Sequence, residues 1–263
     1  MHTKRLQTGR ARTRILLFAI LLSALLVTGC SGLVELFEKA RDVKTVRPSG
    51  VIVTETRDVR GFTGLDIRTV GQVVLTQGNE ESLTISGSDN LVPLVVTQVD
   101  DGVLIIGMQE GTVIASVDSD VLTFDIVLPD LSQLTVSGMA SVQMEDLTTS
   151  DLQVTMSGAG EAKIGDLRAS TVDITVSGLG GVEIAGQVTR QSITISGAGE
   201  VRNADLECER AEVNVPGLGS ATIWVTGELA GKINGAGSVR YYGAPTTDTE
   251  STGVGRFEAL GEK

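Results

Sequence analysis

From residue 134 onward, hydrophobic and polar residues alternate in short runs that are separated by pairs of glycines. In one run Val172, Ile174 and Val176 alternate with polar residues, and the alternation resumes at Val182 after the glycines. A period of two places the apolar side chains on one face of a strand and the polar side chains on the other. The pattern therefore predicts pairs of short, half-buried strands that are joined by glycine-rich corners.

The glycine corners recur as a cassette, Ser-Gly-x-Gly in its best copies, and the seventh and last copy begins at Gly253. Successive copies are 18 to 20 residues apart, a period typical of a solenoid in which each repeat forms one coil. We therefore predict an all-β fold, a parallel β-solenoid whose corner glycines supply positive φ angles. The structural turn glycines of the first six copies are Gly138, Gly158, Gly160, Gly178, Gly180, Gly197, Gly199, Gly217, Gly219, Gly235 and Gly237.

Aligning the copies predicts which residues lie next to one another in the stack. Strands of neighbouring coils lie about 4.8 Å apart, so opposite charges at equivalent positions pair across that distance. The equivalent inward-facing positions of successive repeats form a column that is apolar from Val136 to Ile233 but ends in Ser251. We therefore predict a polar last coil, which protects the exposed strand edge at the end of the stack. The predicted outward column is Gln143, Lys163, Glu183, Arg202, Thr222, Arg240 and Glu258.

Two segments precede the regular repeats. Residues 61–133 lack the cassette but contain β-branched runs at 73–76, 83–86, 94–99, 103–106 and 122–128, so we expect an irregular β-rich opening of the same solenoid. Asp101 and Gly102 predict a hairpin with a type I′ turn. Residues 30–60 are interpreted as a tether with a short helix at 33–40, and residues 134–263 as the regular seven-repeat solenoid with a polar C-terminal cap.

The N-terminus has the pattern of a bacterial lipoprotein signal. Five basic residues precede an apolar run at 15–27, which is too short to span a bilayer and has the length of a signal-peptide core. The run leads into Val27-Thr28-Gly29-Cys30, which resembles a lipobox, so we predict a signal peptide at 1–29 and lipid attachment at Cys30. Ser31 follows the cysteine where an aspartate would favour the inner membrane, so the outer membrane is favoured if the cell has two membranes. An ordinary signal peptide is the alternative.

The net charge limits the class of binding partner, and the cysteine content limits disulfide pairing. Without residues 1–29 the chain has 16 basic and 33 acidic residues, a net charge of 16 − 33 = −17. A strongly acidic chain repels nucleic acid, so no nucleic-acid partner is expected. Once Cys30 is lipidated, Cys208 has no disulfide partner and is interpreted as a half-buried structural thiol.

The repeated turns and two further stretches resemble a known bacterial family. The stretches are Arg60-Gly61-Phe62-Thr63-Gly64-Leu65-Asp66, which opens the β-rich part, and the strand at 124–129 leading into 131–138. They resemble the auto-transporter adhesin family with the head GIN domain, over residues 50–260. The resemblance implies a two-sheet parallel β-solenoid, related in shape to pectin-lyase-like helices but without their catalytic residues, and a role in adhesion. The chain departs from the pattern at Pro216, Asn234 and Thr252, where the turn serine is replaced.

The sequence contains little that points to catalysis. The only histidine is His2, inside the signal segment, so the mature chain lacks the imidazole that most triads and zinc sites require. Glu161, Glu183 and Glu200 lie outward on neighbouring coils, but Lys163 and Arg202 between them predict ion pairs rather than a glycosidase pair. We predict no catalytic residues, no metal site and no cofactor. The serines at the repeated turn position are interpreted as structural: Ser137, Ser157, Ser177 and Ser196.

One pair of residues departs from the repeat. Trp224 and Tyr242 occupy equivalent positions, five residues after Gly219 and Gly237, and the alternation predicts that both point outward. An exposed aromatic pair suits a contact patch for a glycan or a protein. The alternative is a corner pair that the C-terminal segment covers.

Together these patterns predict a non-enzymatic lipoprotein of the cell envelope, which faces the periplasm or the cell surface. Its acidic solenoid would serve adhesion or envelope assembly, with a glycan or an envelope protein as partner. The membrane would be contacted through the N-terminal lipid, and a homo-oligomer is left open. Two alternatives also remain at this point: a polysaccharide-active β-helix enzyme, and a periplasmic scaffold or sensor.

Overall fold

The computed structural model describes residues 43–115 and 122–263. Cys30, the predicted signal segment and the short helix expected at 33–40 lie outside these residues. Two short strands, β1 (Lys44–Val46) and β8 (Thr112–Ile114), pair in a sheet of their own. All remaining strands belong to one 17-stranded sheet that winds into a solenoid. No helix in the described part of the chain is long and apolar enough to cross a membrane.

Antiparallel strands cover one end of the solenoid. The strand β5 (Ser82–Ser88) pairs antiparallel with both β2 (Ile52–Arg57) and β9 (Leu122–Leu128), and β9 pairs parallel with β4 (Val70–Gln77). Residues 52–57 are therefore part of the sheet, and the interpretation of all of 30–60 as a tether is wrong for them. Their alternation was too weak to predict a strand, because every one of these side chains is exposed or half-buried.

The predicted hairpin is confirmed. It joins β6 (Val95–Asp100) to β7 (Val103–Met108), after a short 3-10 turn at Val92–Leu94. Asp101 and Gly102 have φ angles of 46° and 77°, and a type I′ turn requires positive φ at both central residues. The strand β7 then pairs parallel with β3 (Gly64–Ile67), which connects the hairpin to the first coil.

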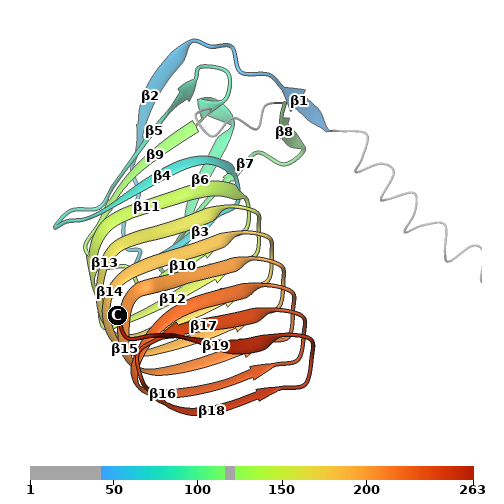
Figure 1. Cartoon of the computed structure of the whole chain (residues 1–263). Coiled ribbons are helices and arrows are strands. Elements are labelled where there is room, and N and C mark those ends of the chain that lie inside the picture. The colour runs from blue at the N-terminus through green and yellow to red at the C-terminus, as the bar shows by residue number, and fades with distance from the viewer. Residues whose placement is uncertain (1–42, 116–121) are drawn as a thin grey trace, which may run out of the picture. The chain divides into compact units, whose positions relative to one another are not determined.

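From β3 and β4 onward every pairing between neighbouring coils is parallel, as Figure 1 shows for the stacked ribbons. The predicted all-β parallel β-solenoid is thus confirmed. The wound sheet has two sides: we call the stacked segments that follow each glycine corner, such as 161–168, the first sheet, and those that precede the next corner, such as 171–176, the second sheet. Inward side chains from both form one continuous apolar core, in which Val136, Met156 and Val176 are fully buried. The strands of the coils are β10 (Gln133–Val136), β11 (Met139–Thr148), β12 (Asp151–Met156), β13 (Glu161–Val176), β14 (Gly181–Ile195), β15 (Glu200–Val215), β16 (Ser220–Ile233), β17 (Ser238–Tyr242), β18 (Thr246–Ser251) and β19 (Arg256–Gly261).

The register agrees with the alignment of the repeats. Each member of the predicted outward column, from Gln143 to Glu258, is the direct parallel partner of the next member. Ser251 lies beside Ile233, as the inward column predicts. All six residues of β18 are exposed, so the last coil is polar and open.

The reason for the corner glycines differs from the expected one. None of the cassette glycines has a φ angle in the left-handed region. A β-carbon on Gly178 would instead lie 2.0 Å from the carbonyl oxygen of Gly158, and one on Gly158 would lie 1.9 Å from that of Gly138. Glycine is required because the corners stack so closely that a side chain on the backbone of one coil would overlap the previous coil.

The opposite corner is less regular, because the coils differ in length. Leu147 pairs with Leu167, but Leu167 pairs with Gly186, and the register shifts again before Leu206. In the next coil Leu229 pairs with Ala211 and not with Leu206. These shifts are β-bulges, which accommodate a coil that is one residue shorter than its neighbours.

A buried polar cluster lies at the shift. The Asn203 side-chain oxygen accepts a hydrogen bond from the Ile184 backbone N–H at 3.2 Å, and its amide donates to the Gln191 oxygen at 3.2 Å. Gln191 Nε2 donates to Cys208 Sγ at 3.1 Å. Asn203 and Gln191 are fully buried, so the cluster satisfies polar groups that would otherwise lie unpaired in the core.

Candidate functional site

The outer face of the first sheet carries a ladder of ion pairs. Lys163 Nζ lies 2.6 Å from a Glu183 carboxylate oxygen, and Arg202 Nε lies 3.1 Å from the other oxygen. Arg202 also pairs with Glu200 at 3.1 Å and with Glu161 two coils away. The predicted pairing is therefore confirmed, and a single arginine links carboxylates of three successive coils.

The ladder keeps its central carboxylate charged. Hydrogen bonds from Lys163 and then Arg202 lower the pKa of Glu183 below its ordinary value. The bond to Glu183 in turn raises the pKa of Lys163. A general acid needs a raised carboxyl pKa, so Glu183 is unsuited to that role near neutral pH.

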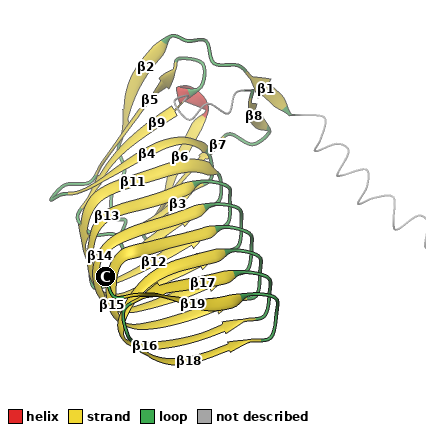
Figure 2. Ribbon diagram, viewed as in Figure 1, coloured by secondary structure: helices red, strands yellow, loops and turns green. Residues whose placement is uncertain are grey.

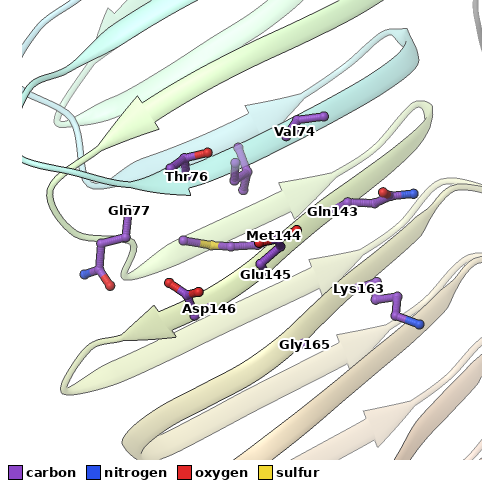
Figure 3. Close-up of a pocket in the computed structure, with 10 residues that line it drawn as sticks. Val74, Thr76, Gln77, Gln143, Met144, Glu145, Asp146, Lys163 and Gly165 are labelled. Carbon is purple, nitrogen blue, oxygen red and sulfur yellow. The ribbon is translucent and has the colours of Figure 1, made fainter.

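A shallow groove of about 460 Å³ lies beside the ladder, over strands β4, β11 and β13 (Figure 3). Lys163 and Gln143 reach its edge from neighbouring coils, and the Gln77 amide closes one end. Gln77 Nε2 donates to the carbonyl oxygens of Pro129 and Thr148 at 3.0 and 2.9 Å, and its oxygen accepts from the Thr148 N–H at 2.9 Å. These hydrogen bonds hold Gln77 at the polar end of the groove, whose lining also includes the apolar side chains of Val74 and Met144.

The carboxylates of the groove are not arranged like those of a glycosidase. Its two carboxylates, Glu145 and Asp146, are neighbours in the chain. Glycoside hydrolysis requires two carboxyl groups that flank the scissile bond from opposite sides, and adjacent residues on one strand do not provide this geometry. The described residues also contain no cluster of His, Cys, Asp and Glu that could hold a metal ion.

Two aromatic residues, Trp224 and Tyr242, lie next to each other at the far end of the same sheet, and we call this pair the aromatic step. Trp224 of β16 and Tyr242 of β17 are direct register partners, which confirms that they are neighbours. Both side chains are half-buried, whereas the sequence pattern predicted an exposed pair. The step follows the charged column closely, because Thr222 and Arg240 lie two residues before Trp224 and Tyr242.

The ammonium group of Lys263 lies over the aromatic step. Its ammonium lies 5.1 Å from the centre of the Trp224 ring and 5.6 Å from that of Tyr242. The Asp205 carboxylate and the Ala204 carbonyl oxygen bind the same ammonium group. The alternative of a pair covered by the C-terminal segment thus describes the geometry better than a bare patch. Its use as a contact site stays a prediction.

The nucleophile candidates occupy structural positions. Ser137, Ser157, Ser177 and Ser196 are exposed at equivalent corner positions, as the repeat predicts. Cys208 is buried rather than half-buried, and its thiol donates to the Trp224 carbonyl at 3.3 Å. Burial raises the pKa of the Cys208 thiol to about 11, so the thiol is protonated at neutral pH.

Three features of the structure were not predicted from the sequence. Lys263 lies next to Trp224 only in three dimensions, and the groove depends on how three coils curve. The Asn203 and Gln191 pair had a weak signal, because both are polar residues at inward positions of the alternation.

Comparisons with known proteins agree with this geometry. A crystal structure described as a "putative adhesin" from Bacteroides fragilis has a TM-score of 0.78 and 26% identity, and the match covers 82% of this chain and 100% of that chain. Two structures from Parabacteroides distasonis, a "putative adhesin" and a "Putative lipid binding protein", have TM-scores of 0.64 and 0.69 at 19% and 18% identity. Each match covers 82% of this chain and 100% of the other. These two show the fold alone.

No protein of curated function matches the chain. The sequence model of one family, described as "Putative auto-transporter adhesin, head GIN domain", matches residues 61–245. The matched region contains the antiparallel strands β5, β6 and β9 and the coils up to β17, including the ion-pair ladder and the aromatic step. On this evidence the chain belongs to the auto-transporter adhesin family with the head GIN domain.

Proposed function

We propose that this protein is a non-enzymatic lipoprotein of the cell envelope that binds a glycan or an envelope protein through the outer face of its first sheet. The lipid at Cys30 would hold the solenoid at the membrane, with the outer membrane favoured in a cell that has two membranes. The observation that carries the proposal is the ladder and aromatic step on one continuous rigid face. Membership of an adhesin family supports the same role.

The physical chemistry of this face suits recognition. Parallel pairing holds each charged side chain at a fixed spacing, so little conformational freedom is lost when a ligand binds. Trp224 and Tyr242 supply the aromatic area on which sugar rings and protein side chains pack. Ion-paired carboxylates and a groove without opposed acids give an enzyme mechanism no support.

The test is the binding of the full chain to isolated cell envelopes, with and without Trp224. We expect Trp224→Ala to weaken binding at least tenfold, because the change removes the largest apolar contact of the face. Val96→Ala, at an exposed apolar residue of β6, is the matched control and should leave binding unchanged. Binding is measured as the fraction of chain that sediments with the envelopes over a range of concentrations.

Two results would contradict the proposal. Unchanged binding of Trp224→Ala would exclude the aromatic step as the contact. Release of sugars from envelope polysaccharide by the purified wild-type chain would favour the enzyme alternative instead.

A further inference from the structure

A ridge of exposed apolar residues runs along the cassette corners, on a different part of the solenoid from the face described above. It consists of the residue that follows the first glycine in each copy. Figure 2 shows these corners as a stack of loops along one side of the coils. The members of this corner ridge, in stacking order, are Met139, Ala159, Leu179, Ala198, Leu218, Ala236 and Val254.

Every member of the corner ridge is exposed to solvent. Leu179, Leu218 and Val254 have 74%, 69% and 92% of their surface exposed, and Met139 has 53%. Large side chains of this kind are normally scattered singly over a protein surface, whereas here they form one line. Val70, the equivalent residue in the coil before Met139, is half-buried, so the exposed ridge begins at Met139.

The backbone of the corner ridge is rigid. From Ala159 onward, the N–H of each ridge residue donates to the carbonyl oxygen of the first glycine in the coil before it, as in Leu179 to Gly158 at 3.1 Å and Leu218 to Gly197 at 2.9 Å, and the Met139 N–H donates to the Thr69 carbonyl oxygen at 3.2 Å. The side chains are therefore fixed at intervals of about 4.8 Å, the spacing between neighbouring strands. No loop movement is needed to present them to a partner.

Large and small residues alternate along the corner ridge. The large residues stand two coils, or about 9.6 Å, apart, and an alanine lies in each gap between them. Two surfaces with this profile interdigitate when the large residues of one meet the gaps of the other. A lipid surface would favour large apolar residues at every position and gives no reason for the alanines.

Charge also favours a second copy of the chain at this corner. The chain is strongly acidic, so most contacts between two copies bring like charges together. Besides the apolar ridge residues, the seven corners contain Ser, Pro, Asn, Thr, Gly and, in the first copy, Ala140, and none of these is charged. Two copies can therefore approach along this strip without burying an unpaired charge.

We propose that the corner ridge is a self-association surface that pairs two copies in antiparallel orientation. A two-fold axis midway between two coils places the large residues of each copy opposite the alanines of the other, and such a contact closes on itself. A strip about 29 Å long and roughly 15 Å wide covers on the order of 400 Å² of each copy, about half of what a stable complex buries. The dimer is therefore weak, and it forms at high local concentration.

The test fills one gap. Ala198→Leu introduces a side chain that the same corner position already accommodates in Leu179 and Leu218, so the fold should be unaffected. Filling the gap blocks interdigitation although it makes the ridge more apolar. We expect the dissociation constant of the dimer to rise at least tenfold, measured by sedimentation equilibrium of the full chain in mild detergent. Ala230→Leu, at an exposed outward position of β16, is the matched control and should leave the constant unchanged.

A second variant and a measurement of vesicle binding complete the test. Leu179→Asp with Leu218→Asp removes two large residues and should also weaken the dimer at least tenfold. The proposal is overturned if the wild-type chain stays monomeric up to about 1 mM, or if Ala198→Leu strengthens association. It is also overturned if Ala198→Leu binds phosphatidylcholine vesicles more tightly than the wild-type chain does, because that result identifies a general apolar or lipid-binding surface.

Discussion

At the scale of single residues, the absence of a side chain is what allows the coils to stack. The cassette glycines adopt backbone angles that other residues also adopt. Each one, however, lies so close to a carbonyl oxygen of the previous coil that an added β-carbon would overlap that oxygen. The requirement is therefore steric and not conformational. Each glycine serves the contact between two coils more than the turn in which it lies.

Alanine at one of these glycines should be strongly destabilising. In Gly178→Ala the new β-carbon would lie 2.0 Å from the Gly158 carbonyl oxygen, and backbone atoms on both sides are held by stacking. We expect the free energy of unfolding to fall by more than about 3 kcal/mol, as for other large steric faults in a core. Chemical denaturation of the variant measures the change.

Gly181→Ala is the matched control, three residues further along the same coil. A β-carbon there would lie 3.4 Å from the nearest nitrogen of the flexible Arg202 guanidinium and 3.8 Å from the Glu200 carbonyl oxygen, which is ordinary van der Waals contact. The effect should stay within about 1 kcal/mol, since the backbone angle is ordinary and the neighbour is flexible. Equal losses from the two variants would contradict the steric explanation.

At the scale of strands, the ion-pair ladder makes the outer face of the first sheet sensitive to acid. The folded chain favours the charged form of Glu183, because Lys163 and Arg202 both donate to its carboxylate. The contribution of these bonds is present above the ordinary pKa of 4.5 and is lost as the pH falls through the lowered pKa. Exposed ion pairs contribute little each, so the total effect is modest.

The variant Glu183→Gln should flatten part of this acid dependence. Between pH 7 and pH 3 the free energy of unfolding should fall less steeply than in the wild-type chain, and the two curves should converge at the acid end. At pH 7 we expect the variant to be less stable by up to about 1 kcal/mol. Urea titrations at several pH values provide the comparison, with Glu212→Gln on the second sheet as the control. Parallel curves for the wild-type chain and Glu183→Gln would refute the assignment.

Most of the strand arrangement could be predicted from the sequence, and the exceptions have physical causes. Period-two alternation and the regular spacing were enough to place Lys163, Glu183 and Arg202 side by side, because a parallel stack keeps equivalent positions in register. The half-burial of Trp224 and the bulges near Gly186 could not be predicted. The surroundings of Trp224 include Lys263, which lies 39 residues further along the chain. The bulges depend on where a shorter coil changes its register against its neighbours.

At the scale of the whole solenoid, the two ends differ. Antiparallel strands cover the first coil, whereas β18 pairs only with β16 and has every residue exposed. In a stack whose units contact only their neighbours, the uncovered end opens first and the central coils open last. Backbone amides of β18 and β19 should therefore exchange with deuterium earlier than those of β13 and β14. Uniform protection along the stack would show that the solenoid opens as one unit.

The steric rule at the corners also has a consequence for the length of the molecule. From Gly158 onward each corner offers its successor the same carbonyl oxygens and requires the same glycines in return, so a complete coil can be removed or duplicated without changing the corner contacts of the others. An incomplete coil would shift every later column. The distance between the covered end and the open end is therefore adjustable during evolution in steps of about 4.8 Å, the thickness of one coil.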